Sequence, residues 1–238
     1  YGLHQASRAW HTKLVTKLNE IGFSASNADP SLFVKGKGPH KVHLLVCVDD
    51  LLIASNSTKM MAETKWHLAE EFDLRDLGEV SLFLGMEIKR NKSASTMTVT
   101  QKKYAVELVD RFGMADAKPA SVPMQPSLIL PHEPKGQAPM QEATKFRSLV
   151  GGLMYLAVCT RPDIAQAVYK LARFMSKPAH MHWEAAKSVL RYVKGTAECG
   201  ILYGRSKPLV GYADSDWASE IDSRRSTTGY VFMLNGGA

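Results

Sequence analysis

The chain has 238 residues with a formal net charge of +7, and 45% of its residues are hydrophobic. This length predicts one large domain or two modest ones with sizeable cores. The basic excess is compatible with a polyanionic partner but does not establish one, because phosphate binding needs local clusters of Lys and Arg. The sequence contains no run of about 18 apolar residues, so we expect no membrane span.

The cysteines bear on where the protein is found. Cys47, Cys159 and Cys199 are far apart in the sequence and form neither a CxxC pair nor a zinc pattern. This is typical of a reduced compartment without structural disulfides, and no signal peptide is visible. We therefore expect an intracellular protein, cytoplasmic or nuclear, and not a secreted one.

The N-terminal stretch predicts a helix. Trp10, Leu14, Leu18 and Ile21 recur at helical spacing, and Gly22 is suited to end the helix. Trp10 heads this apolar stripe, so we expect it to lie in the core rather than to stack on a base. A strand-like segment and a turn follow.

Two adjacent carboxylates, Asp49 and Asp50, interrupt the apolar run at residues 43–54. The flanks are rich in β-branched and large apolar residues, which predicts a β-hairpin with the pair at its tip. Like charges held side by side near a core repel each other, and a divalent cation with oxygen ligands would offset that repulsion. Palm-type polymerases present metal ligands on such a hairpin. The plain alternative is a solvated turn, because Asp is a common turn residue.

The pattern then continues with helices and hairpins. Ser57 or Thr58 can cap a helix that runs to about Phe72. The further expected elements are a hairpin built from residues 82–88 and 97–100, and a helix over residues 104–112 that Gly113 ends.

Six prolines change the composition at residues 117–140 and predict a linker. Beyond it, apolar spacing predicts three helices and then strands. The helices are expected over residues 146–157, 162–175 and 183–195, and the strands at 201–203, 209–213 and 229–233. Hairpins, then helices, then a new sheet define an α+β chain with at least two units. The sequence begins at Tyr1 inside a motif-like stretch, and we expect it to be a segment of a longer polypeptide.

Several motifs follow one another in a specific order. YGLHQASRAW at residues 1–10 resembles the YGLKQAPRAW stretch of copia-type LTR retrotransposon reverse transcriptases, and CVDD at 47–50 resembles their YVDD box. DLGE and FLGMEI, within residues 76–88, resemble a segment near the primer grip. Later blocks of the family resemble FRSLVGGLMYL at 146–156, TRPDI at 160–164, LRYVKGT at 190–196 and YADSDWA at 212–218. The last block resembles the start of the family's RNase H domain, and the resemblance covers essentially the whole chain.

The resemblance implies an α+β architecture and templated DNA synthesis within a polyprotein. It divides the chain into part of a reverse transcriptase palm (1–116), the linker (117–140), a helical thumb or connection region (141–199) and the first strands of an RNase H-like domain (200–238). The sequence departs from the family at Cys47, where the family has Tyr, and at Ser7, where it has Pro. The first palm aspartate of the family would precede Tyr1, and the later RNase H carboxylates would follow Ala238.

The resemblance also implies roles for acidic residues. Asp49 and Asp50 are expected to be catalytic ligands of Mg²⁺, with Mn²⁺ as a substitute. Asp214 aligns with the first metal ligand of RNase H, and Asp216 is the alternative. A nucleotide pocket is expected to be faced by Tyr1, Gly2, Gln5 and Cys47. Gly2 is equally compatible with a simple turn before the helix.

The densest basic stretch is expected to contact the backbone of a primer–template duplex. It consists of Lys89, Arg90, Lys92, Lys102 and Lys103. The alternative is a solvated charged face, because exposed Lys is ordinary. The implied partners are an RNA or DNA primer–template, dNTPs and other segments of the polyprotein, which would assemble in a virus-like particle.

The segment alone is expected to have little or no polymerase activity, because its third palm carboxylate is missing. The alternative function is therefore a domesticated or degenerate fragment that acts at most as a nucleic-acid-binding or interaction protein. A cyclase-type palm also uses carboxylates on a hairpin, but it would not need the TRPDI and LRYVKGT blocks.

Overall fold

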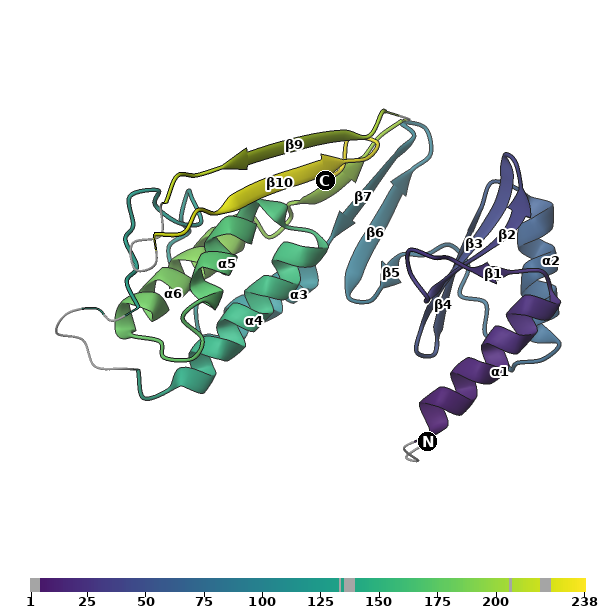
Figure 1. The fold of residues 1–238 in the computed structure, drawn as a ribbon, viewed down its shortest axis with the longest axis horizontal. Helices are drawn as coiled ribbons and strands as arrows, with labels where there is room; N and C mark the ends of the chain where they lie inside the picture. The colour runs from purple at the N-terminus through teal and green to yellow at the C-terminus, as the bar shows by residue number, and fades with distance from the viewer. Residues whose placement is uncertain (1–4, 133, 135–139, 206, 219–223) are drawn as a thin grey trace. The chain divides into compact units, whose positions relative to one another are not determined.

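The computed structural model of this chain describes residues 5–132, 134, 140–205, 207–218 and 224–238 (Figure 1). Over these residues it is a mixed α+β chain with three antiparallel sheets and six α-helices. The chain divides into two compact units, unit 1 (Tyr1–Val80) and unit 2 (Ser81–Ala238). The predicted α+β class is therefore confirmed. None of the helices in the described ranges is long and apolar enough to cross a membrane.

Unit 1 is a four-stranded antiparallel sheet in the order β1-β2-β3-β4, with two helices packed on it. Its elements are α1 (Ala6–Glu20), β1 (Ser24–Ala25), β2 (Leu32–Lys37), β3 (His40–Cys47), β4 (Asp50–Ser55) and α2 (Thr58–Ala69). Phe33 pairs with Leu44 across two strands, so both side chains lie on one face. That face packs on Leu14 of α1 and Leu68 of α2, and all four side chains are buried.

The end of α1 and the start of α2 follow the predicted signals, whereas α2 ends at Ala69 rather than at about Phe72. Gly22 follows α1 with φ +88°, and the Phe23 N–H donates to the Leu18 carbonyl at 2.9 Å, which closes the helix as expected for a glycine C-cap. Ser57 precedes α2, and its hydroxyl accepts the N–H of Met60 at 3.3 Å. The predicted cap is thus Ser57.

Unit 2 combines a second four-stranded sheet, a bundle of helices and a two-stranded hairpin. Its elements are β5 (Leu82–Phe83), β6 (Met86–Asn91), β7 (Thr96–Thr100), α3 (Lys102–Arg111), α4 (Ala143–Cys159), the 3-10 turn η1 (Pro162–Ile164), α5 (Ala165–Ala172), α6 (His180–Gly195), β8 (Gly200–Tyr203), β9 (Val210–Ser215) and β10 (Thr228–Met233). Leu108, Leu153, Val168 and Leu190 from the four helices form its buried core. The strand β8 pairs with β7 and so completes the sheet of β5 and β6. The domain boundaries inferred from the sequence stay predictions.

The sequence predicted one strand over residues 82–88, and this was wrong in one respect. Phe83 pairs with Met86, so Leu84 and Gly85 form a two-residue turn between β5 and β6. Both turn residues have positive φ, 49° and 71°. A two-residue hairpin with this pattern favours glycine at its second position, and the Leu-Gly pair within an apolar run was the signal for a turn.

Part of the proline-rich segment 117–140 lies against the helices of unit 2. Lys170 on α5 donates from Nζ to the Leu128 carbonyl at 2.8 Å. His182 on α6 is buried and lies 2.9 Å from the Pro131 carbonyl through Nε2, while its other ring nitrogen accepts a backbone N–H. Burial lowers the pKa of His182, so the neutral ring donates to Pro131. Hydrogen bonds from the helices therefore fix the described part of this segment at Leu128 and Pro131.

The TRPDI and LRYVKGT blocks meet in a polar network around one buried side chain, that of Arg161. Arg161 is 2% exposed and donates to both carboxylate oxygens of Asp163, at 2.9 and 2.8 Å. It also donates to the carbonyl and hydroxyl of Thr196, and the Tyr192 hydroxyl donates to Asp163. Burial acts to raise the pKa of Asp163, but the bonds from Arg161 outweigh it and the pKa lies below its ordinary value. The network joins the start of η1 to the end of α6.

Candidate functional site

The two adjacent aspartates lie at the tip of the β3–β4 hairpin in unit 1. Cys47 pairs with Asp50, so Val48 and Asp49 are the two central residues of the turn. The angle φ is 54° at Val48 and is not positive at Asp49, which is the pattern of a type II′ turn. A β-branched residue in left-handed backbone is a strained outlier. The predicted hairpin is confirmed, and its tip carries local strain.

The register decides which way the side chains around this turn project. Val46 and Leu51 pair with each other and pack against the core of unit 1. Because successive side chains alternate between the faces of a strand, Cys47 and Asp50 project from the face opposite the helices. Both aspartates are exposed, and Cys47 is half-buried.

The donor set at this turn fits a hard divalent cation in part. Carboxylate oxygens are the protein ligands of Mg²⁺, which usually takes only one or two of them and completes its shell with water and substrate phosphate. Asp49 and Asp50 supply two such carboxylates. Within the described ranges, no group of three or more His, Cys, Asp or Glu residues is arranged to hold a metal ion.

Asp214 lies on β9 of unit 2, opposite Gly229 of β10. It is exposed, and its Oδ1 accepts the N–H of the next residue, Ser215, at 2.8 Å. The Oδ1 of Asp216 accepts the N–H of Thr227 at 2.9 Å across the same hairpin. Asp214 belongs to unit 2 and the Asp49–Asp50 pair belongs to unit 1.

The predicted nucleotide-pocket residues are only partly visible. Tyr1 and Gly2 lie outside the described residues. Gln5 precedes α1, is exposed, and its carbonyl accepts the N–H of Ala9 at 2.9 Å. Cys47 stands directly before the turn, as the sequence predicted.

All five residues of the predicted basic stretch are exposed, but they do not form one continuous basic surface. Lys89 and Arg90 are neighbours on β6, so their side chains project to opposite faces. Lys102 forms an ion pair with Glu198 at 2.6 Å, and the hydrogen bond to this carboxylate raises the pKa of Lys102. The backbone N–H of Lys103 donates to Glu87 at 2.9 Å.

Two aromatic side chains at turns were missed by sequence reasoning. The Trp10 indole N–H on α1 donates to the Val48 carbonyl at 2.9 Å. The Tyr155 hydroxyl on α4 donates to the Leu84 carbonyl in the turn between β5 and β6. Trp10 lies at the edge of the unit 1 core, as its place in the apolar stripe predicted, but that pattern does not reveal where its N–H finds an acceptor.

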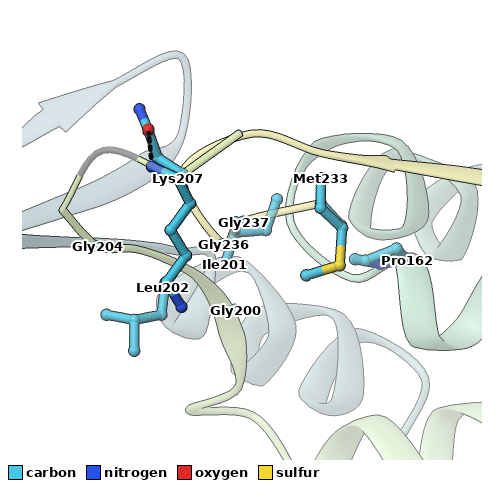
Figure 2. A pocket seen from close by; sticks show the side chains of 11 residues that line it. Pro162, Gly200, Ile201, Leu202, Gly204, Lys207, Met233, Gly236 and Gly237 are labelled. Carbon is cyan, nitrogen blue, oxygen red and sulfur yellow. Dashed lines mark hydrogen bonds between the residues drawn. The ribbon is translucent and has the colours of Figure 1, made fainter. Parts of the chain in front are cut away.

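A cavity of about 340 Å³ lies in unit 2 and does not coincide with either carboxylate site (Figure 2). It is lined by β8 and by the residues that follow β10, with Leu202 and Met233 among the apolar contributors. The Lys207 N–H donates to the Asn235 side chain at its margin, at 3.1 Å. Among the residues that the structure describes, no Asp, Glu, His or Cys lines it, so these walls offer none of the usual metal ligands.

Comparison with known proteins identifies the family. Residues 1–126 match the reverse transcriptase (RNA-dependent DNA polymerase) family, and this range includes the Asp49–Asp50 hairpin. The chain belongs to this family. No solved structure matches the chain.

The relatives define the branch. The chain is 38% identical to a retrovirus-related Pol polyprotein from transposon TNT 1-94 of Nicotiana tabacum, over 100% of this chain and 18% of that protein. It is 40% identical to the Pol polyprotein from transposon RE1 of Arabidopsis thaliana, over 98% of this chain and 16% of that protein. An uncharacterized mitochondrial protein of Arabidopsis thaliana is 37% identical over 81% of this chain and 79% of its own length. The chain is homologous to the reverse transcriptase region of copia-type Pol polyproteins. It spans less than a fifth of the length of the tobacco and Arabidopsis Pol polyproteins.

Proposed function

We propose that this chain supplies, within a longer polyprotein, two of the catalytic carboxylates for templated DNA synthesis. One observation carries the proposal. Asp49 and Asp50 are exposed at the tip of a two-residue hairpin whose strands are anchored in a core, inside the region that matches the reverse transcriptase family.

In this proposal Asp49 and Asp50 hold Mg²⁺, or Mn²⁺ in its place, on the face of the sheet opposite the helices. The bound metal would favour ionisation of the primer 3′-hydroxyl and offset the charge of the triphosphate. Gln5 and Cys47 are proposed to face the incoming dNTP, with Tyr1 and Gly2. Cys47, smaller than the Tyr of the family, would pack less against the primer end.

The wider assignments are proposals of the same kind. Residues 1–116 would contribute to the palm, helices α4 to α6 to a thumb or connection region, and β9–β10 to the start of an RNase H-like domain with Asp214 as a metal ligand. The exposed basic residues, Lys89, Arg90, Lys92, Lys102 and Lys103, would contact the phosphate backbone of the primer–template. Binding through them would weaken steeply as salt is raised.

A chimera tests the proposal. The chain replaces the matching segment of the tobacco Pol polyprotein, and Mg²⁺-dependent primer extension is measured. Extension is expected from the chimera and not from the 238-residue chain alone. Loss of extension with Asp49→Asn or Asp50→Asn is expected, with Asp73→Asn, an exposed aspartate of the same unit, as the matched control. Equal extension by Asp49→Asn and Asp73→Asn would overturn the proposal.

The second candidate is a stand-alone, non-catalytic fragment that binds nucleic acid. The mitochondrial relative favours it, because most of the length of that protein corresponds to this segment. An inactive chimera, together with salt-sensitive binding of a primer–template by the chain alone, would support this second function over the first.

A further inference from the structure

The turn that carries Asp49 accepts a hydrogen bond from outside the hairpin, at the carbonyl of Val48. The indole N–H of Trp10, on α1, donates to the carbonyl oxygen of Val48 at 2.9 Å. The Val48 side chain is 75% exposed, so packing of that side chain does not keep its backbone in the left-handed region. Strained backbone of this kind persists only where the surroundings determine it.

The bonded carbonyl belongs to the peptide that decides the type of turn. Types I′ and II′ differ mainly in the orientation of the peptide between the two central residues, here Val48 and Asp49. Because the peptide is planar, the carbonyl of Val48 and the N–H of Asp49 turn together. A flip of this peptide would give Asp49 a positive φ and redirect its carboxylate. The Trp10 bond opposes that flip.

The donor is itself fixed by the core of unit 1. Trp10 is half-buried against the hydrophobic cluster, and its ring meets Phe72 edge to face at 5.2 Å between centroids. An N–H on a ring anchored in this way does not follow the turn if the turn moves. Order in the core is thereby transmitted from α1 to the tip of the β3–β4 hairpin.

We propose that Trp10 is a positioning residue for the metal-binding carboxylates, because its indole N–H holds the Val48–Asp49 peptide in one of two orientations. The proposal rests on the function proposed above, in which Asp49 and Asp50 bind the metal. Trp10 touches neither metal nor substrate in this role.

The experiment uses the 238-residue chain, ¹⁵N-labelled, with two variants at residue 10. Trp10→Phe removes the N–H and part of the ring, whereas replacement of Trp10 by benzothienylalanine removes the N–H and keeps the ring shape. Trp66→Phe is the matched control, because Trp66 is an exposed tryptophan on α2 of the same unit. The readouts are the order and orientation of the Val48–Asp49 peptide and the affinity for Mn²⁺.

The first readout is the backbone of the turn. In both Trp10 variants, the order parameter at Asp49 is expected to fall below about 0.6. A cross-peak between the amide protons of Val48 and Asp49 is expected to grow, because these protons come together when the peptide flips. Trp66→Phe is expected to match the wild type. A turn that keeps its wild-type order without the indole N–H would overturn the inference.

The second readout is Mn²⁺, followed by paramagnetic broadening at Asp49 and Asp50. The Trp10 variants are expected to need about two to ten times more Mn²⁺ than the wild type, the range that corresponds to one hydrogen bond. A loosened turn with unchanged Mn²⁺ affinity would make Trp10 merely structural and overturn the positioning role. Failure of the wild type itself to bind Mn²⁺ at these residues would overturn the assignment of Asp49 and Asp50 as metal ligands. The positioning role of Trp10 would then be overturned as well.

Discussion

The Val48–Asp49 turn of unit 1 and the Leu84–Gly85 turn of unit 2 are two-residue hairpin turns of different types. Each joins two antiparallel strands through two residues, and each begins with an apolar residue at positive φ, 54° and 49° respectively. In each, an aromatic side chain from a helix donates to the carbonyl of that first residue. The second position differs, because Asp49 lacks the positive φ that Gly85 has, 71°.

That difference places the central peptide in opposite orientations in the two turns. Positive φ at both positions is the type I′ pattern, which glycine adopts without strain. Positive φ at the first position alone is the type II′ pattern, which favours glycine at the first position and has Val48 there instead. Both turns thus keep an apolar side chain at positive φ in the first position, and they differ in that the turn of unit 2 also needs glycine at the second position and has it in Gly85. Strain of this kind tends to persist at functional sites.

The largest expected effect separates chemistry from folding. Asp49→Asn in the chimeric Pol polyprotein is expected to lower primer extension by about 10³-fold, because metal-based charge stabilisation is worth several kcal/mol. Its free energy of unfolding should change by less than about 0.5 kcal/mol, as for most exposed substitutions. Steady-state extension and hydrogen exchange of β3 and β4 amides measure the two. A large loss of stability would instead show that the Asp49 carboxylate has a structural role.

The next effect concerns folding alone. Gly85→Ala is expected to destabilise unit 2 by about 1–2 kcal/mol, the cost of a side chain in left-handed backbone. A Cβ there would also stand 3.2 Å from the Tyr155 hydroxyl. Hydrogen exchange of β6 and β7 amides provides the measurement, with Gly151 as control, because a Cβ at that helix position meets nothing within 4 Å. Equal costs at the two glycines would mean that the type I′ geometry makes no demand for glycine.

The sequence was sufficient to predict most elements and the location of the carboxylate hairpin. Apolar periodicity and local signals such as Gly22 and Ser57 specify helices and their ends, because those forces act within a few residues. The pairing of β8 with β7 was not predictable, because about 100 residues separate the two strands. The apolar pattern within a strand does not indicate which other strand it pairs with. The Trp10 bond to Val48, 38 residues away, escaped for the same reason.

The phenol at the second turn gives a smaller, pH-dependent effect. Burial raises the pKa of Tyr155 above its ordinary value of 10.0, so the folded state favours the neutral, donating hydroxyl. Its contribution is fully present below pH 10 and is lost as the pH rises through the higher folded pKa. Tyr155→Phe is expected to cost about 0.5–1 kcal/mol at pH 7. The same substitution should also reduce the decrease in the free energy of unfolding of unit 2 that occurs as the pH rises above 10.

The pH series is best read as a difference between wild type and Tyr155→Phe. Burial also raises the pKa of Tyr192 in unit 2, and that contribution cancels in the difference. The ring of Tyr104 contacts Tyr155 at 5.0 Å between centroids, so the difference reports Tyr155 together with its coupling to Tyr104. Hydrogen-exchange protection of β6, corrected for the intrinsic rate at each pH, supplies the comparison. A constant difference from pH 8 to above pH 10 would show that Tyr155 does not titrate as the donor to Leu84.

The smallest effect tests whether the first turn stores strain at all. Val48→Asn is expected to stabilise unit 1 by about 0.5–1 kcal/mol, because Asn tolerates left-handed backbone far better than a β-branched residue. The Val48 side chain is 75% exposed, so little packing is lost in exchange. Leu84→Asn is the paired measurement in unit 2, where Leu84 is 42% exposed and unbranched at Cβ. A larger gain at Val48 than at Leu84, by hydrogen exchange in each unit, is expected if strain is concentrated at the carboxylate turn; equal gains would mean that both turns carry only the common cost of a side chain at positive φ.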